Sequence, residues 1–338
     1  MNTCPQTEID ILGIGASTLD RFIVVDHYPT GREVQQVVSS TTDGGGPVAT
    51  ALAVAGKYGA RTAMIDSIGD DMVGRHILDD FKKYNVNTDA IHIEKGEKSG
   101  VATILVKHST GERAVFFERS TAPEPVFLDT HKQLIKEAFI LHVNGRHRQF
   151  MCSAMALAQE AGTIISLDGG AQRYDEEMKS ITESSHIAIV ARDYAEKYTG
   201  TTNLEEACRI IHERGACIAG VTDGANGSYF VWPDGTFYRC ESFTQSTVVD
   251  TTGAGDSFHG AFLANLGHTI NHMKGQDTTS TTKHDRASIH AVELLKACAH
   301  SDLEKAAIFA SAVASLNTQG IGGRSPLPTL KSVQELIG

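Results

Sequence analysis

The stretch DTTGAGDSFHGAF, residues 250–262, joins a glycine-rich turn to an apolar run with the spacing of a helix. A helix that begins in this way directs free backbone N–H groups, and the positive end of its dipole, at whatever lies in front of it. Such an end is suited to bind an anion. Yet the side chain at this point, Asp256, is itself an anion. The stretch therefore raises the question of why a carboxylate stands where a phosphate should bind.

Phosphoryl transfer would explain this combination. A phosphate that is transferred, rather than only held, needs stabilisation of the charge on its oxygens and activation of the incoming hydroxyl. The backbone N–H groups of Gly253, Ala254 and Gly255 can meet the first need. Asp256 can meet the second by accepting the proton of the hydroxyl. The alternative is that Asp256 only caps the helix; the residue pattern favours the catalytic interpretation.

The composition is that of an ordinary globular enzyme. The chain has 338 residues, a formal net charge of −11, 41% hydrophobic and 21% charged residues. This acidic balance, without a run of Lys or Arg, argues against nucleic acid and membranes as partners. The six cysteines are scattered, which favours reduced thiols. Without a visible signal peptide, and with no apolar stretch near the roughly 20 residues that cross a bilayer, we expect a cytoplasmic protein.

Short apolar runs alternate with amphipathic stretches along the chain, and this alternation predicts an α/β fold. The runs at 9–15, 139–145 and 163–170 end in Gly, as buried parallel strands often do. Strands alternating with helices predict βαβ units and a mostly parallel sheet covered on both faces. Residues 19–40 and 99–120 instead have strand–turn–strand character, which predicts a small separate sheet that serves as a lid.

The segment 268–290 is polar, and we interpret it as a surface insertion of a single domain that spans residues 1–338. His268 and His272 have a spacing that can bind zinc on a helix. No Cys or acidic partner follows them nearby, so the sequence argues against a metal site there.

Three motifs resemble those of the PfkB family of carbohydrate kinases. DTTGAGDSFHGAF resembles the second hallmark of the family. GGGPVATALAVAGKYG (44–59), followed by IGDDMVG (68–74), resembles the first hallmark, and TDGANGS (222–228) resembles the nucleotide-binding turn. Their order and spacing fit over residues 8–337. The resemblance implies a ribokinase-like three-layer αβα core with a β-sheet lid, a kinase dependent on ATP and Mg²⁺, and a homodimer formed through the lid.

The resemblance also implies roles for individual residues. Asp256 would be the catalytic base, and the anion hole would comprise Gly253, Ala254, Gly255 and Asp256. The hydroxyls of the sugar would be held by Asp20, Gly45 and Gly46. The nucleotide pocket would be lined by Thr222, Gly224, Gly227, Asn317 and Gly320. A monovalent cation such as K⁺, which the family often binds near this loop, would be held at Asp250, Thr252 and the segment 320–325.

The chain departs from the family pattern in its first motif and in its metal element. Thr50 stands where the family usually has Asn. The N-x-x-E element, which the family links to Mg²⁺ and phosphate, does not align well with residues 191–200. Asp193 and Glu196 are therefore only weak metal candidates, and Mg²⁺ would instead be held through water and phosphate.

A third departure concerns the substrate. Many sugar kinases of the family carry an acid or amide at the strand end that here reads HVNGRHR (142–148). Arg146 could pair bidentately with an anionic substituent, with Arg148, Arg113 and Arg119 as further candidates. GGGPVAT (44–50), LDGG (167–170), the altered N-x-x-E element and GGRS (322–325) together look most like the branch that contains sulfofructose kinase, whose substrate carries a sulfonate. The alternative is that Arg146 pairs with Asp168 and the sugar is neutral, such as fructose or ribose.

Three other functions are alternatives to that of a sugar kinase. A nucleoside kinase would need aromatic walls for a base, but the single Trp, Trp232, lies in an expected hairpin turn. A dinucleotide-dependent oxidoreductase would need a helix after the first strand, whereas ASTLDRFIVVD (16–26) continues as a strand. A sensor that binds sugar or nucleotide without turnover stays open because the N-x-x-E element is altered, although the intact GAGD argues against it.

Overall fold

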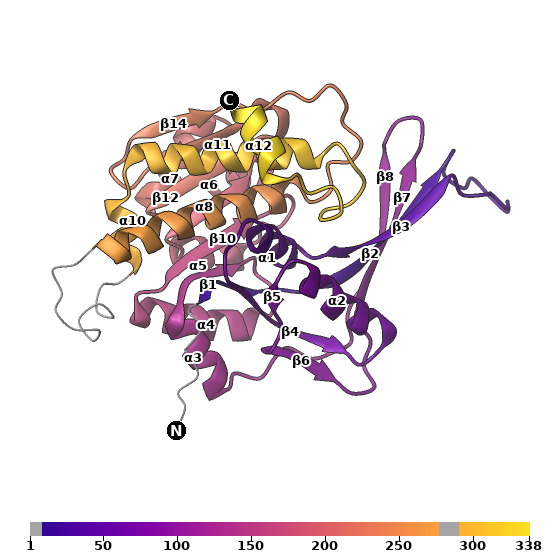
Figure 1. The fold of residues 1–338 in the computed structure, drawn as a ribbon, viewed down its shortest axis with the longest axis horizontal. Coiled ribbons are helices and arrows are strands. Elements are labelled where there is room, and N and C mark those ends of the chain that lie inside the picture. The colour runs from indigo at the N-terminus through magenta and orange to yellow at the C-terminus, as the bar shows by residue number, and fades with distance from the viewer. Residues whose placement is uncertain (1–8, 277–290) are drawn as a thin grey trace.

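The computed structural model describes residues 9–276 and 291–338, whose strands form two sheets (Figure 1). The larger sheet has ten strands within this part of the chain. Its order is β14 (Phe237–Cys240), β13 (Ser228–Val231), β12 (Ile218–Thr222), β11 (Ile187–Ala191), β10 (Ile164–Gly169), β9 (Ala138–Val143), β1 (Ile9–Ile14), β4 (Thr62–Gly69) and β5 (Val86–Asn87), with β6 (Ile91–Glu94) also beside β4.

The central strands of this sheet are parallel. Every pairing from β12 to β5 is parallel, whereas the β13–β14 hairpin at one edge is antiparallel. Strands β1, β9 and β10 are buried along their whole length, as their continuous apolar sequences require. Because the carboxyl ends of parallel strands meet at one edge, Asn144, Asp168 and Thr222 lie along the same rim of the sheet.

Helices cover both faces of the large sheet (Figure 1). One side carries α1 (Pro47–Lys57), α2 (Met72–Lys83), α8 (Ala254–Gln276), α10 (Ala291–Ala297), α11 (His300–Asn317) and α12 (Leu330–Ile337). The other carries α3 (Asp129–Glu137), α4 (Arg148–Ala161), α5 (Glu176–Glu183), α6 (Arg192–Thr199) and α7 (Leu204–Glu213). Successive strand residues point to opposite faces, so Ile11 and Leu12 of β1 belong to two separate apolar cores.

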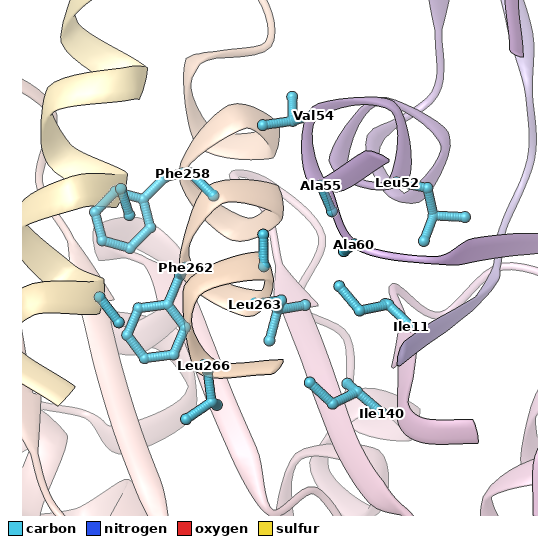
Figure 2. Packing of buried hydrophobic residues seen from close by; sticks show 14 of the residues in the cluster. Ile11, Leu52, Val54, Ala55, Ala60, Ile140, Phe258, Phe262, Leu263 and Leu266 are labelled. Atoms are coloured by element: carbon cyan, nitrogen blue, oxygen red, sulfur yellow. The ribbon is translucent and has the colours of Figure 1, made fainter. Parts of the chain in front are cut away.

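Helix α8 packs between α1 and α11 on the first face. Figure 2 shows its apolar side chains Phe258, Phe262, Leu263 and Leu266 together with those of α1 and of the strands below. A side chain at Gly260 would collide with the carbonyl of Ala51, so this glycine permits the close contact of α8 with α1. The packing fixes the beginning of α8, and with it residues 253–256, above the carboxyl rim of the sheet.

The second sheet is the predicted lid. Its order is β3 (Ser39–Gly45), β2 (Thr18–Val25), β7 (Gly100–Lys107) and β8 (Arg113–Glu118), with β2 and β7 parallel and the outer pairs antiparallel. It projects away from the helical layers in Figure 1. The structure therefore confirms the predicted α/β core with a separate small sheet. The strand after β2 begins only at Ser39, because residues 26–38, which include Pro29 and Gly31, are irregular.

The first residues of the polar segment 268–290, as far as Gln276, are helical. Helix α8 continues to Gln276, because Ile270 is fully buried and Met273 packs against the same core as Leu266. Leu266, Ile270 and Met273 follow one another at helical spacing. The polar residues between them make this pattern hard to recognise in the sequence. Residues 277–290 lie outside the described part of the chain. None of the helices within 9–276 and 291–338 is long and apolar enough to span a membrane.

Candidate active site

The beginning of α8 has the geometry of an anion site. Gly253 precedes the helix with a φ of 73°, and a side chain there would collide with Gly323. The N–H of Ala254 donates to the carbonyl of Thr251 at 3.3 Å, and the N–H of Ser257 donates to that of Gly253 at 2.7 Å. The N–H groups of Gly255 and Asp256 lie in the first turn, where a helix supplies no acceptor. These two N–H groups are therefore the donors best placed to form hydrogen bonds to a phosphate oxygen.

The half-buried carboxylate of Asp256 has the properties of a general base. Burial, together with the negative charge of Asp168, raises its pKa to about 6, and the charge of Asp20 acts in the same direction. A base whose pKa lies just below neutrality is ionised at physiological pH and still accepts a proton readily. The structure therefore gives Asp256 an environment that a simple helix cap does not need.

Asp168 is held in its ionised form behind Asp256. Burial alone would raise the pKa of Asp168, but the charges of His259 and Arg173 outweigh burial and lower it. His259 Nε2 lies 3.4 Å from Asp168 Oδ1, and a guanidinium nitrogen of Arg173 lies 4.0 Å from Oδ2. The sequence did not single out His259 or Arg173. His259 follows Asp256 by three residues, so it lies on the same side of α8.

The residues predicted to hold the sugar come together where the lid meets the core. Asp20 Oδ1 of β2 accepts a hydrogen bond from Thr18 Oγ1 at 2.8 Å, and burial raises the pKa of Asp20 to about 6. A side chain at Gly45 would collide with the Asp20 carboxylate. Gly45 and Gly46 thus bring bare backbone next to an acceptor that can bind hydroxyl groups.

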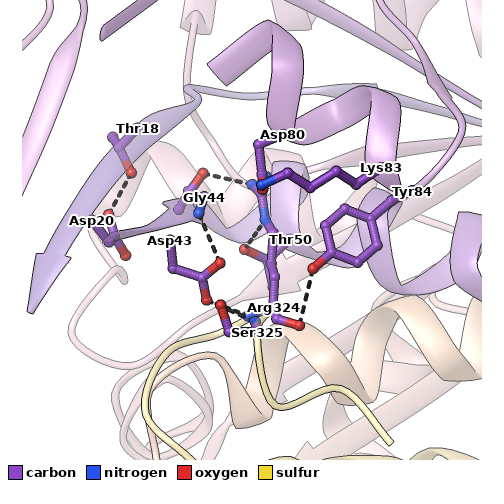
Figure 3. A network of polar contacts seen from close by, with 11 residues as sticks. Thr18, Asp20, Asp43, Gly44, Thr50, Asp80, Lys83, Tyr84, Arg324 and Ser325 are labelled. Carbon is purple, nitrogen blue, oxygen red and sulfur yellow. Dashed lines mark hydrogen bonds and ion pairs between the residues drawn. The ribbon is translucent and has the colours of Figure 1, made fainter. Parts of the chain in front are cut away.

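Arg324, a fully buried arginine, supports this glycine loop (Figure 3). Its guanidinium donates to Asp80 Oδ2 at 2.6 Å, to the carbonyl of Gly45 at 2.8 Å and to Thr50 Oγ1 at 3.2 Å. Its backbone N–H donates to Asp43 Oδ2 at 2.8 Å. The departure from the family pattern at Thr50 therefore has a structural role, because the hydroxyl of Thr50 accepts a hydrogen bond from Arg324.

A cavity of about 420 Å³ opens beside the beginning of α8 and is lined by three of the five residues predicted for the nucleotide pocket. These are Thr222, Gly224 and Gly227, around the short 3₁₀ turn η1 (Gly224–Asn226). Thr251, Ala254 and Gly255 line its inner end, so the cavity reaches the anion site. Its size suits a nucleotide.

Two residues predicted for the nucleotide pocket lie elsewhere. Asn317 is fully buried and donates from Nδ2 to the carbonyl of Gly323 at 3.2 Å. Gly320 packs closely against Pro326. The wall is instead completed by residues that the sequence did not single out, namely Ser242, Phe243, Thr244, Gln245, Val248, Phe258, Ser311, Ala314, Ser315 and Thr318. The three lining residues of α11, Ser311, Ala314 and Ser315, are small and follow one another at helical spacing. This pattern is visible in the sequence and could have indicated a helix face that lines a cavity.

Three arginines from different elements lie within electrostatic reach of one another. Arg146 follows β9 and Arg173 follows β10, while Arg119 follows lid strand β8. Partial burial, and the positive charges of Arg173 and Arg119, lower the pKa of Arg146. Within residues 9–276 and 291–338, no carboxylate forms an ion pair with Arg146 or Arg119. The alternative in which Arg146 pairs with Asp168 is not realised, since the partners of Asp168 are His259 and Arg173.

Arg148 and Arg113, which the sequence also offered for an anionic substituent, are engaged by carboxylates. Arg148 lies 2.6 Å from Glu177 and 3.3 Å from Asp175. Arg113, the first residue of β8, reaches across to Asp250 at 2.9 Å. Because both side chains already pair with carboxylates, neither remains a candidate for binding an anionic substituent of the substrate.

The predicted cation ligands Asp250 and Thr252 are contacted by the same lid arginine. The guanidinium of Arg113 donates to Asp250 Oδ1 and to the hydroxyl of Thr252. An additional K⁺ would meet this positive charge, so the residues do not fit a monovalent cation while Arg113 is in place.

The weak Mg²⁺ candidates are also engaged. Asp193 accepts a hydrogen bond from the backbone N–H of Gln172 at 2.7 Å, and Glu196 pairs with Arg192 at 2.8 Å. In the part of the chain that the structure describes, no group of three or more His, Cys, Asp or Glu side chains could hold a metal ion. A Mg²⁺ ion here would depend on phosphates and water, as Mg²⁺ commonly does.

The fold and the site together define a phosphotransferase: an anion site at a helix beginning, an adjacent carboxylate base, a nucleotide-sized cavity and a lid. Residues 9–330 match the pfkB family of carbohydrate kinases. The chain belongs to this family and is a carbohydrate kinase, an enzyme that phosphorylates an alcohol group.

The chain is similar to a curated fructokinase, and solved structures share its fold. Fructokinase-2 of Solanum habrochaites is 28% identical over 241 residues, which are 66% of this chain and 72% of that protein. The ribokinase of Arabidopsis thaliana, solved with ribose and ATP, has a TM-score of 0.75 at 20% identity, with 98% and 99% of the chains covered. An E. coli protein of the same fold, solved with ATP and Mg²⁺, has a TM-score of 0.75 at 17% identity, with 97% and 99% covered.

Proposed function

We propose that this kinase transfers the γ-phosphate of ATP to a hydroxyl of an anionic monosaccharide, a ketohexose that carries a sulfonate or a phosphate. The kinase chemistry follows from the family. The anionic substituent is supported by one observation, the group of Arg146, Arg119 and Arg173 at the substrate end, of which Arg146 and Arg119 have no carboxylate partner in residues 9–276 and 291–338.

In this proposal the residues of the site act in sequence on the sugar hydroxyl. Asp20 and the backbone of Gly45 and Gly46 hold the sugar so that one hydroxyl faces Asp256. Asp256 accepts the proton of that hydroxyl, and the N–H groups at the beginning of α8 stabilise the charge on the transferred phosphoryl group. Mg²⁺, held by the phosphates of ATP, would supply further neutralisation of charge.

The nucleotide occupies the cavity next to α8. Thr222, Gly224 and Gly227 lie at its outer wall, and Thr251, Ala254 and Gly255 at its inner end. The γ-phosphate would then face the free N–H groups of the first helical turn, while the sugar approaches from the lid side. This arrangement places donor and acceptor on opposite sides of the anion site, as an in-line transfer requires.

Arg146 and Arg119, which have no carboxylate partner within residues 9–276 and 291–338, lie near a third like charge, that of Arg173, and their repulsion is costly unless an anion joins them. The lowered pKa of Arg146 expresses this repulsion. The loop that carries Arg146 is held firmly, because His147 has a φ of 49° and its Nε2 lies 2.7 Å from Asp66 Oδ1. The side-chain nitrogen of Asn144 is buried beside this loop without a hydrogen-bond partner in the described residues. A sulfonate or phosphate oxygen would satisfy these donors.

The arginines provide the test. We expect Arg146→Ala to lower kcat/KM for fructose 6-phosphate or 6-sulfofructose by about 10–100-fold, the value of a charge-assisted hydrogen bond. Its effect on fructose should be within about threefold. Arg148→Ala is the matched control, because Arg148 follows by two residues and is already paired with Asp175 and Glu177. Equal losses for neutral and anionic sugars, or equal effects of the two variants, would contradict the proposal.

Neutral sugars are the second candidate substrates. Fructokinase-2 of Solanum habrochaites is named for fructose, and the Arabidopsis ribokinase was solved with ribose. If this chain phosphorylates fructose or ribose much better than their anionic counterparts, the kinase assignment stands and the arginine group has a structural role.

We also infer that the protein forms a homodimer through its lid. Strand β8 is an edge of the lid sheet and exposes Val115, Phe116 and Phe117. An exposed apolar edge strand favours pairing with a second copy of the chain.

A further inference from the structure

The side chain of Arg113 joins the lid to the catalytic loop. This residue is the first of β8 and lies opposite Val106 of β7, on the face of the lid that carries Asp20. Its guanidinium donates to Asp250 Oδ1 at 2.9 Å, to Thr251 Oγ1 at 2.8 Å and to the hydroxyl of Thr252. The three acceptors are consecutive and directly precede Gly253, at the start of the anion site.

The contacts of Asp250 leave little capacity for another cation. The carboxylate is almost fully buried. Oδ1 also accepts hydrogen bonds from the N–H of Thr252 at 2.9 Å and from its hydroxyl at 2.7 Å. Oδ2 accepts from the N–H of Gly322 at 3.0 Å. A buried carboxylate needs a compensating positive charge, and Arg113 supplies it.

We propose that Arg113 is a positioning residue that takes the place of a monovalent cation at this loop, so that the kinase does not require K⁺. The guanidinium compensates the charge of Asp250 and fixes Thr251 and Thr252, which set the direction of the N–H groups that follow. Because Arg113 belongs to the lid, the charge that compensates Asp250 comes from the lid sheet and not from a bound ion.

The inference does not depend on which sugar is the substrate. Thr251 lines the nucleotide cavity, so binding of MgATP alone reports on the same loop. If the anionic-sugar proposal fails, the cation response of MgATP binding is still a valid test. If the response to cations contradicts the role of Arg113, the sugar proposal is unaffected.

The first measurement uses the wild-type protein. The dissociation constant of MgATP, and the rate of ADP release with the best sugar of a neutral and anionic panel, are measured in KCl, NaCl and choline chloride at equal ionic strength. We expect values within about twofold across the three salts, because the guanidinium is covalently present. An activation by K⁺ of about tenfold or more would overturn the proposal, since it would show that the loop lacks its cation without the salt.

The second measurement removes the guanidinium. In choline chloride, Arg113→Ala should weaken MgATP binding and slow turnover by about tenfold or more. KCl, or guanidinium chloride at low concentration, should restore part of this loss, which a merely structural defect would not allow. Arg113→Lys should retain more activity than Arg113→Ala but less than wild type, because one ammonium group cannot contact three acceptors in the same geometry.

Arg21→Ala is the matched control, since Arg21 is an exposed arginine on the opposite face of the same lid sheet. It should behave like wild type in every salt. An Arg113→Ala protein that is folded by thermal melting, yet as active as wild type in choline chloride, would contradict the proposal. If that variant does not fold, the salt response of the wild type and of Arg113→Lys still decides the question.

Discussion

At the scale of single residues, the catalytic assignment depends on Asp256. We expect Asp256→Asn to lower the rate of ADP release by about 10²–10⁴-fold, because the amide cannot accept the proton of the hydroxyl. A helix cap would behave differently, since Asn caps helices as well as Asp does. Near-normal activity of this variant, in a protein that still binds MgATP, would show that Asp256 has no catalytic role.

The same variant should be more stable than wild type at neutral pH. Folding raises the pKa of Asp256 from its ordinary value of 3.8 to about 6, so the ionised carboxylate is less favourable in the folded state than in the unfolded chain. This cost is fully present above about pH 6 and absent below about pH 4. The melting temperature of Asp256→Asn should therefore be higher than that of wild type near pH 8. The difference should vanish near pH 4.

The activity should increase with pH, as expected when a general base must be ionised to act. We expect kcat/KM to rise with pH through a midpoint of about 6 and then to level off, because only ionised Asp256 accepts a proton. Asp168→Asn should shift that midpoint to lower pH, because the negative charge that raises the pKa of Asp256 is removed. A midpoint that stays in place in the variant would contradict this electrostatic coupling.

At the scale of elements, the segment after α11 joins parts of the site that are far apart in the sequence. Arg324 holds the carbonyl of Gly45 and the carboxylate of Asp80 on α2, while Gly322 contacts Asp250. The substrate loop and the anion site are thus held against the same short segment. A change at Arg324 should therefore affect sugar binding without direct contact to the sugar.

We expect Arg324→Met to lower the free energy of unfolding by about 3–5 kcal/mol, because it removes the buried partner of the Asp80 carboxylate and leaves only the exposed Lys83 beside it. It should also raise KM for the sugar more than it lowers kcat. Lys83→Ala is the control: Lys83 also pairs with Asp80, but its side chain is 62% exposed. That pair should contribute less than about 1 kcal/mol. Urea unfolding of both variants checks this prediction. Equal losses in the free energy of unfolding would contradict it.

Much of the fold, and part of the site, could be predicted from the sequence, because local patterns carry that information. The apolar runs predicted the parallel strands. The glycines before α1 and α8 predicted the turn beside Asp20 and the free N–H groups at the beginning of α8, whose binding roles stay predictions. The pairing of the arginines could not be predicted. Arg146 and Arg148 are two residues apart, yet only Arg148 faces Asp175 and Glu177. Asn317 was misplaced because the sequence does not show whether a polar residue after a helix lines a cavity or is buried.

At the scale of the whole molecule, the exposed edge of the lid predicts the oligomeric state. We expect the wild type to be a dimer in solution and Phe116→Asp to shift it to monomer, because a charge would be placed in an apolar interface. Phe116 is 59% exposed in the single chain. Leu330→Asp, at an exposed position on α12, is the control and should leave the dimer intact. Sedimentation velocity checks this, and a monomeric wild type would remove the basis for the proposed interface.

The lid also connects the two proposals on substrate and cation. Its strand β8 begins at Arg113, which contacts the anion site, and is followed by Arg119, which lies near Arg146. If both proposals hold, β8 and the residue that follows it supply positive charge near the transferred phosphate and near the substituent of the sugar.

The measurement that tests the central claim most directly is kcat/KM of the wild-type protein, with saturating MgATP, for fructose and for its 6-phosphate and 6-sulfonate. If the arginine group recognises the substituent, the anionic sugars should be preferred by about 10–100-fold or more, as one or more charge-assisted hydrogen bonds provide. A preference for fructose would contradict the claim, because three arginines would then contribute nothing to the choice of substrate.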